Sequence, residues 1–359
     1  MNFYTFNFDA HHRYVLWLLV LAFVPAIALF ALGVFLEPLY GDLTRIGGYA
    51  ERSYGWSRPQ LEFSKPLYTI DKYTRYHDVV VLGDSFSRAW PLQQWQNYVV
   101  AATDLSVVTL NINALKLDNV IRSRVFREMP PKFFVLESVE REFPARLKDQ
   151  PPCGTSDLPQ QIPMVKPHLV HTESMEKFAE YVERKTVSSD VKLGFVLKYL
   201  WYGAWRNLAG AEKSDARMVE LAVLAPFSSL NRKEMLVYKD DFKKVMSPPE
   251  MGLVEMGCRI ERIRKNVEAN GKTRFVLLVA PDKLTAYADL IGDKALRNVS
   301  ELGRLSEQHP KVIPRTDLAL TSAIHSGELD VYLPDDTHWG SNGHRIAAET
   351  LLDFLREPE

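Results

Sequence analysis

The sequence lacks the features that would tie it to nucleic acid, to a disulfide scaffold or to a thiolate zinc site. Its 44 Lys+Arg and 45 Asp+Glu residues nearly cancel, so there is no basic surplus for a phosphate backbone. Two cysteines among 359 residues are too few for a disulfide framework, and a zinc site would need His or Asp to complete it. The composition, 46% hydrophobic and 25% charged, is that of a globular protein.

One long apolar run stands out near the start, because residues 15–36 carry no charge. A helix of this length spans about 33 Å, enough for the hydrocarbon core of a membrane. The run exceeds the apolar region of a typical signal peptide, and no small-residue cleavage site follows it. We therefore expect residues 1–37 to be a single-pass anchor and residues 38–359 to form the folded domain. The lysine and arginine counts on the two sides do not fix its orientation.

Four short apolar runs predict buried strands of a parallel sheet, each bounded by a break or followed by a helical pattern. They are residues 79–82, 105–110, 132–139 and 274–280. Strands that alternate with amphipathic helices are typical of an α/β fold. Between the third and fourth strands, residues 143–265 or so are read as a long insertion or helical subdomain. The chain closes with a strand-like segment at 330–333, a polar loop and a helix for which Ser341 is the expected N-cap.

Three residues carry the chemistry. Ser85 directly follows the first strand, and open α/β sheets bind ligands beyond the carboxyl ends of their strands. A serine needs a base within hydrogen-bond reach, and His338 in the last loop can supply it, with Asp336 to orient the imidazole. Asp335 is an alternative acid. Taken alone, Gly-Asp-Ser is equally consistent with a tight or phosphate-binding turn, and the aspartate and His338 with a loop ion pair or half of a weak metal site with His344.

Together, GDSFS at 83–87 and DDTHW at 335–339 resemble the SGNH-hydrolase superfamily, in the branch of the alginate and related polysaccharide O-acetyltransferases. The resemblance covers residues 70–359 in outline. It implies a three-layer, flavodoxin-like parallel sheet, with Ser85 as nucleophile, His338 as base and Asp336 as its orienting acid. In the alginate enzymes the D-x-H-W element precedes the serine, whereas here the serine comes first. The resemblance therefore does not identify the polysaccharide that is acetylated.

The resemblance also implies oxyanion donors after the second and third strands. Laying the strands in register puts Ala114, in the sequence Asn-Ile-Asn-Ala with Asn113, where SGNH esterases have a glycine N–H. Arg141 falls where they have an asparagine, as a donor or a substrate clamp, or else as a surface residue paired with a neighbouring glutamate. Lys283 resembles the lysine of a Pro-x-Lys motif in this branch, which implies contact with an acidic sugar. A solvated surface lysine is the default reading.

The leading hypothesis is O-acetyl transfer to an exported polysaccharide through an acetyl ester on Ser85, with no cofactor and no resident metal. The sequence shows no acyl-carrier or coenzyme A motif, so a membrane acyl-transfer partner would supply the acetyl group. The domain would then lie in the periplasm or outside the cell, on the cytoplasmic membrane. Cys153 and Cys258 would pair there or remain buried thiols. A deacetylating esterase with the same triad and a non-catalytic biosynthesis scaffold are the alternatives.

Overall fold

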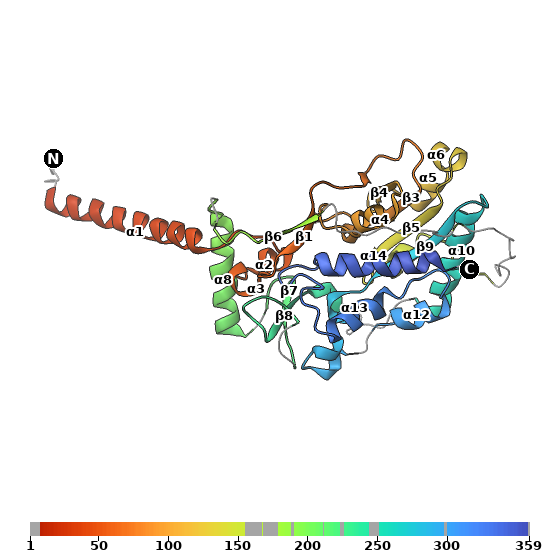
Figure 1. The fold of residues 1–359 in the computed structure, drawn as a ribbon. Coiled ribbons are helices and arrows are strands. Elements are labelled where there is room, and N and C mark those ends of the chain that lie inside the picture. Colours follow the sequence, from red (N-terminus) through yellow and green to blue (C-terminus); the bar gives the residue numbers. More distant parts are fainter. Residues whose placement is uncertain are drawn as a thin grey trace.

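The computed structural model contains a five-stranded parallel sheet with helices on both faces (Figure 1). The strand order is β2-β4-β3-β5-β9, and every neighbouring pair is parallel. The strands are β2 (Thr69–Ile70), β3 (Val79–Gly83), β4 (Val107–Asn111), β5 (Phe133–Val139) and β9 (Arg274–Ala280). The structure describes residues 8–154, 167, 179–187, 190–210, 212–222, 226–243, 251–297 and 300–357.

Alternate residues of the central strand β3 face opposite helical layers. Val79 and Val81 belong to the core under α4 (Trp95–Thr103), α13 (Thr316–His325) and α14 (Ser341–Arg356). Val80 and Leu82 belong to the core on the other face. That second layer contains α5 (Leu117–Ile121), α6 (Arg124–Glu128), α7 (Phe143–Leu147), α10 (Leu253–Glu268) and α12 (Leu302–Gln308). Burial on both faces explains why these strands read as unbroken apolar runs, and it confirms the predicted three-layer α/β fold.

The expected insertion is mixed rather than wholly helical. It contains α8 (Leu193–Ala209), but also strand β6 (Ala179–Val182) and the hairpin of β7 (Ala216–Glu220) and β8 (Glu234–Tyr238). Strand β6 pairs antiparallel with β1 (Gln60–Phe63), so the insertion is joined to the segment that follows the N-terminal helix. Parts of the predicted insertion, among them 155–166 and 244–250, lie outside the described residues.

The segment at 330–333 is not a strand of the main sheet. It forms one isolated antiparallel bridge, between Tyr332 and Trp339, across the loop that carries Asp336 and His338. The remaining short elements are α2 (Asp42–Gly47), α3 (Glu51–Tyr54), α11 (Lys283–Ala286) and the 3-10 turns at Ser85–Ser87, Lys239–Phe242, Ala288–Leu290 and Lys294–Leu296.

The N-terminal helix α1 (Phe8–Phe35) projects away from the domain (Figure 1). Within it, His11–Phe35 contains an 18-residue window with a mean hydropathy of 2.8 and no buried residue, and this segment is long and apolar enough to cross a membrane. Length and composition identify it as a signal sequence or a single anchor.

Cys153 and Cys258 form a disulfide that ties the chain after α7 to helix α10, which resolves the two readings left open by the sequence. Their Cα atoms are 6.3 Å apart and their sequence separation is 105 residues. A bridge that closes a loop of this length removes much conformational freedom from the unfolded chain.

Removing this disulfide is expected to lower the free energy of unfolding by about 2–4 kcal/mol. The measurement compares thermal unfolding of the full chain with and without a thiol reductant, alongside a C153A/C258A double variant. Reductant should lower the midpoint of wild type to that of the double variant and leave the double variant unchanged. Equal midpoints for all samples would contradict the stabilising role.

Candidate active site

The residue expected as nucleophile lies at an exposed turn beyond the end of a central strand. Ser85 begins the 3-10 turn that follows β3. Its side chain is exposed, whereas its neighbours Asp84 and Phe86 are buried. Asp84 caps this turn by accepting from the Phe86 N–H (3.0 Å) and holds the next strand by accepting from the Val139 N–H (2.8 Å). The Ser85 N–H, in the first turn, has no partner inside the helix, as is general for such positions.

Beneath this turn, Glu137 is a completely buried carboxyl group that anchors it. It accepts from the Asp84 N–H at 3.0 Å and from the Ser87 hydroxyl at 2.7 Å. Burial, followed by the Asp84 charge, raises the pKa of Glu137 well above its usual value. Sequence analysis missed Glu137, whose position in a strand was its only pattern.

His338 lines the same cleft as Ser85, and its ring lies 5.0 Å from that of Phe86, centroid to centroid. Its Nδ1 is 2.6 Å from Asp336 Oδ1, which also accepts from the His338 N–H at 2.9 Å. Because Nδ1 faces a carboxylate, the neutral ring carries its proton there and leaves a lone pair on Nε2. Nε2 is buried and has no hydrogen-bond partner among the described residues, so it is available to take a proton.

Asp336 and Asp335 have opposite environments. Burial raises the pKa of Asp336, but the charge of His338 and hydrogen bonds outweigh it, and the pKa lies below its usual value. Asp335 is turned away from His338 towards Glu51, and burial followed by the Glu51 charge raises its pKa well above normal. The Asp335 carboxyl oxygens and Glu51 Oε2 have no other partner among the described residues. This environment favours the protonated form of Asp335, whereas that of Asp336 favours the carboxylate.

Sequence analysis also missed Asp42, which is the first residue of α2. Its N–H donates to Asp336 Oδ2 (3.1 Å), and its carboxylate accepts from the N–H and hydroxyl of Thr337 at 2.9 and 2.7 Å. The adjoining Gly41 is required by close approach, since a Cβ there would overlap the Asp335 carbonyl oxygen. The start of α2 therefore holds the loop that carries His338.

The oxyanion side of the cleft differs from the expectation. The Ala114 N–H donates to the Asn111 carbonyl (3.1 Å) inside a turn, and Ala114 does not line the cleft. Asn113 does, and its Oδ1 accepts from Arg146 Nη1 at 3.1 Å. Because arginine only donates, this contact assigns the Asn113 oxygen and leaves the amide Nδ2 as a donor.

Arg146 was missed by sequence analysis and joins three parts of the site. Besides Asn113, it donates to the Ser138 hydroxyl at 2.8 Å and lies 3.3 Å from Asp84 Oδ2. It comes from α7, whose short amphipathic pattern gave no reason to single out one arginine.

Arg141 lines the cleft, but its partners are not the neighbouring glutamates. Nη1 contacts the buried carboxylates of Asp282 (2.9 Å) and Asp241 (3.3 Å), and its guanidinium lies 5.3 Å from the centre of the Tyr238 ring. Burial lowers the pKa of Arg141, but the two aspartates raise it above the ordinary value. Arg141 therefore stays charged and joins the insertion to the sheet edge.

Lys283 is not the solvated lysine of the default sequence reading, and it does not line the cleft that contains Ser85. It is 1% exposed, and its Nζ donates to the carbonyls of Leu333, Pro334 and Asp336 at 2.7, 3.0 and 3.1 Å. Burial lowers the pKa of Lys283 to about 8. Its role is to hold the backbone of the loop that precedes His338.

Metal-ligand geometry in the described residues is confined to one group. Asp42, Asp336 and His338 offer ligand atoms within 4.8 Å of one another. The alternative ligand His344 is not part of this group, because it is buried with its ring against Trp339.

Comparison with known families gives one match, in which the family model of the SGNH hydrolase-like domain of the acetyltransferase AlgX covers residues 238–359. The C-terminal part of the chain is therefore similar to this acetyltransferase family. The AlgX-like segment contains Asp336 and His338 and runs from the end of β8 to the C-terminus. Ser85 lies outside it, in the part of the same sheet that precedes the insertion. Neither the curated proteins nor the solved structures gave a match to this chain.

The carboxylate of Asp42 is expected to influence the pH dependence of the reaction at the candidate site. Burial lowers the pKa of His338, but Asp336 first and Asp42 after it raise it above 6.5. Burial and the Asp336 charge raise the pKa of Asp42 itself to about 6, so above that pH it is charged. A general base works when neutral, so the acid limb of the pH profile should lie above 6.5.

Asp42→Asn removes that charge while keeping the size of the side chain. The acid limb of kcat/KM should therefore move to lower pH. Asp240→Asn is the matched control, because Asp240 lines the same cleft but is paired with Lys243 at 2.9 Å. Coincident profiles for wild type and Asp42→Asn would show that Asp42 does not tune the base.

Proposed function

We propose that the chain is an O-acetyltransferase that moves an acetyl group through Ser85 onto hydroxyls of an exported polysaccharide. The observation that carries this proposal is the cleft shared by Ser85 and the Asp336–His338 pair, in a chain with an AlgX-type acetyltransferase segment. The cleft measures about 420 Å³ and is open at one side, which suits one sugar unit of a long polymer better than an enclosed small molecule.

In the first half-reaction Ser85 Oγ attacks the carbonyl carbon of an acetyl ester or thioester donor. His338 Nε2 takes the serine proton, and Asp336 stabilises the imidazolium. The tetrahedral oxyanion is held by the Ser85 N–H and the Asn113 amide, fixed by Arg146. The bond to the leaving group then breaks, His338 returns the proton to that group, and acetyl-Ser85 remains.

In the second half-reaction a sugar hydroxyl attacks acetyl-Ser85, with its proton passing to His338. The intermediate collapses, Ser85 leaves and regains the proton, and the sugar carries the acetyl ester. Water in place of the sugar would give a deacetylating esterase, which uses the same residues and is the second candidate.

The proposed location is the outer side of the cytoplasmic membrane, with α1 as an uncleaved anchor. Two observations support it: the exposed apolar length of α1 and the disulfide, since disulfides persist in oxidising compartments. A membrane acyl-transfer partner would then deliver the acetyl group to Ser85.

Asn113→Ala is expected to lower kcat by about 10²–10³ while KM changes little, because an oxyanion donor acts mainly in the transition state. Thermal unfolding should stay close to wild type, since the Asn113 side chain is exposed. A variant with wild-type kcat would exclude Asn113 as an oxyanion donor.

The function is tested with the full chain in detergent micelles, p-nitrophenyl acetate as donor and a panel of oligosaccharides. Release of p-nitrophenol and gain of acetyl mass on sugar are followed for wild type and Ser85→Ala. Ser85-dependent release with acetyl gain on a sugar supports the transferase. Ser85-dependent release with acetate as the product for every sugar favours the esterase. Equal behaviour of the two proteins favours the non-catalytic scaffold.

A further inference from the structure

Helix α8 presents an apolar stripe that no other described residue covers. Its large members are between 42% and 87% exposed: Leu193, Leu197, Leu200, Trp201 and Leu208. Their spacing of 4, 7, 8 and 15 residues from the first places them on one face of the helix. A contiguous exposed apolar stripe of this kind marks an interaction surface. Val196 is the one buried side chain of this helix among those described.

The polar side of α8 is already docked on the domain. Lys198 Nζ donates to the Arg45 carbonyl (3.1 Å), and Arg206 donates to the carbonyls of Gly47 and Gly48 at 2.8 and 2.9 Å. These acceptors lie in and directly after α2, whose first residue, Asp42, contacts Asp336. The docking leaves the apolar stripe as the outward face.

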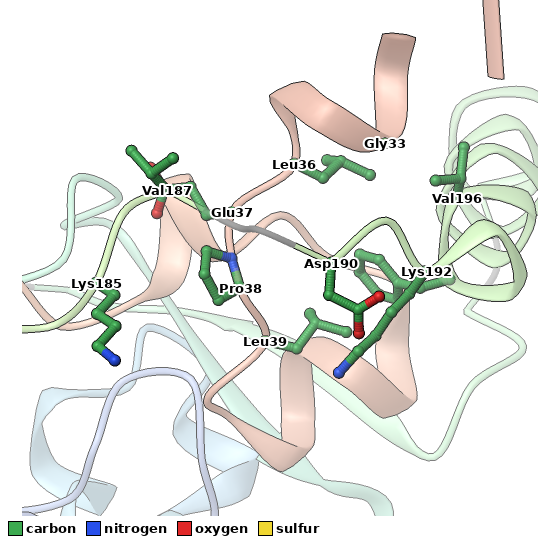
Figure 2. Close-up of a pocket in the computed structure, with 11 residues that line it drawn as sticks. Gly33, Leu36, Glu37, Pro38, Leu39, Lys185, Val187, Asp190, Lys192 and Val196 are labelled. Atoms are coloured by element: carbon green, nitrogen blue, oxygen red, sulfur yellow. The ribbon is translucent and has the colours of Figure 1, made fainter. Parts of the chain in front are cut away.

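The start of α8 packs against the end of α1. A Cβ at Gly33 would lie 3.2 Å from Val196 Cγ2, so the two helices are in close contact. Figure 2 shows the pocket between them, with Gly33 of α1, Leu36 directly after α1, and Val196 of α8. Helix α8 runs crosswise at this end of α1 (Figure 1). If α1 follows the membrane normal, α8 lies along the plane of the membrane.

The composition of α8 suits the boundary between lipid and water. It contains no acidic residue, and Lys198 and Arg206 are its basic ones. The pocket at the start of α8 adds no net charge, since Lys185 and Lys192 are matched there by Glu37 and Asp190. Tryptophan and tyrosine, which it also carries, are enriched at the level of lipid headgroups, and basic amphipathic helices bind anionic lipid.

We propose that α8 is an in-plane membrane helix whose apolar stripe enters the lipid bilayer that α1 spans. The stripe adjoins the apolar surface of α1, so the two helices present one continuous lipid-facing surface. In this arrangement one side of α8 contacts lipid and the other side contacts α2, which holds the loop of Asp336. The two contacts would keep the cleft at a fixed height and orientation above the membrane. The inference rests on the proposed anchoring of α1 and is independent of acetyl transfer.

The test places nitroxide labels on the full chain in nanodiscs of phosphatidylcholine and phosphatidylglycerol. Leu197→Cys and Trp201→Cys report on the stripe, Leu21→Cys reports on α1, and Val254→Cys is the matched control, an apolar residue 87% exposed on α10. The two native cysteines are disulfide-bonded and do not take the label. Collision rates with oxygen, which partitions into lipid, and with a water-soluble nickel chelate are measured for each label.

The proposal predicts high oxygen and low nickel collision at 197 and 201, approaching the values at 21, with the reverse at 254. Labels at 197 and 201 that resemble 254 while 21 is lipid-exposed would overturn the proposal and leave the anchor intact. Shielding from both reagents would also overturn it, because that result indicates packing against protein, such as a second copy. A water-exposed label at 21 would overturn the anchoring and this inference together, without bearing on acetyl transfer.

Discussion

Replacing Ser85 by alanine is expected to lower kcat for p-nitrophenol release from p-nitrophenyl acetate by at least about 10⁴-fold, because no acetyl-enzyme can form. The fold should be unaffected, since the Ser85 side chain is exposed at its turn and donates to no group that the turn requires. The loss should therefore appear in kcat, with an unchanged unfolding midpoint.

The matched control is Ser326→Ala, an exposed serine after α13 that does not line the cleft. Initial rates of p-nitrophenol release are measured for wild type and both variants at the same detergent concentration. Ser326→Ala should keep the wild-type rate. A Ser85→Ala protein that is folded and as active as wild type would exclude Ser85 as nucleophile.

The second large effect is expected from Asp336→Asn, with a loss of about 10⁴-fold in kcat. An amide can accept from His338 Nδ1 but cannot stabilise the imidazolium, and it can also donate and so favour the wrong tautomer. The three contacts that Asp336 accepts, from the Asp42 N–H and from the N–H and Nδ1 of His338, would then be made without the negative charge.

Asp335→Asn is the sharpest control, because it changes the adjacent carboxyl in the same way. Burial and the Glu51 charge raise the pKa of Asp335 well above its usual value, so replacing the carboxyl by a neutral amide of the same size removes little charge from the site. Its kcat should stay near that of wild type. A larger loss for Asp335→Asn than for Asp336→Asn would reverse the assignment of the orienting acid.

The sheet was predictable because each of its long strands is buried on both faces. Strands β3, β5 and β9 have no partly exposed residue, so an unbroken apolar run identifies each of them. Strand β2 has two residues, both half-buried, and gave no pattern to detect. Ser341, the expected N-cap of the last helix, is instead its first residue and accepts from the Leu61 N–H.

The candidate site was predictable where the residues are close in sequence or follow a strand. Asp336 and His338 are two residues apart, and Ser85 follows β3, so local patterns pointed to them. Asp42, Glu51 and Arg146 reach the site from other elements, and their contacts with Asp336, Asp335 and Asn113 depend on the tertiary fold. Lys283 was misread for a similar reason, since a buried lysine that binds three carbonyls has no sequence signature.

The most direct test of acetyl transfer from Ser85 to a sugar is a single-turnover chase. The full chain is loaded with isotopically labelled acetyl from p-nitrophenyl acetate, freed of donor, and then mixed with oligosaccharide. Our account predicts one acetyl group on the peptide that contains Ser85, followed by its loss and the appearance of the label as a sugar ester. Label that appears on sugar without ever residing on Ser85, or that leaves Ser85 only as free acetate for every acceptor, would contradict it.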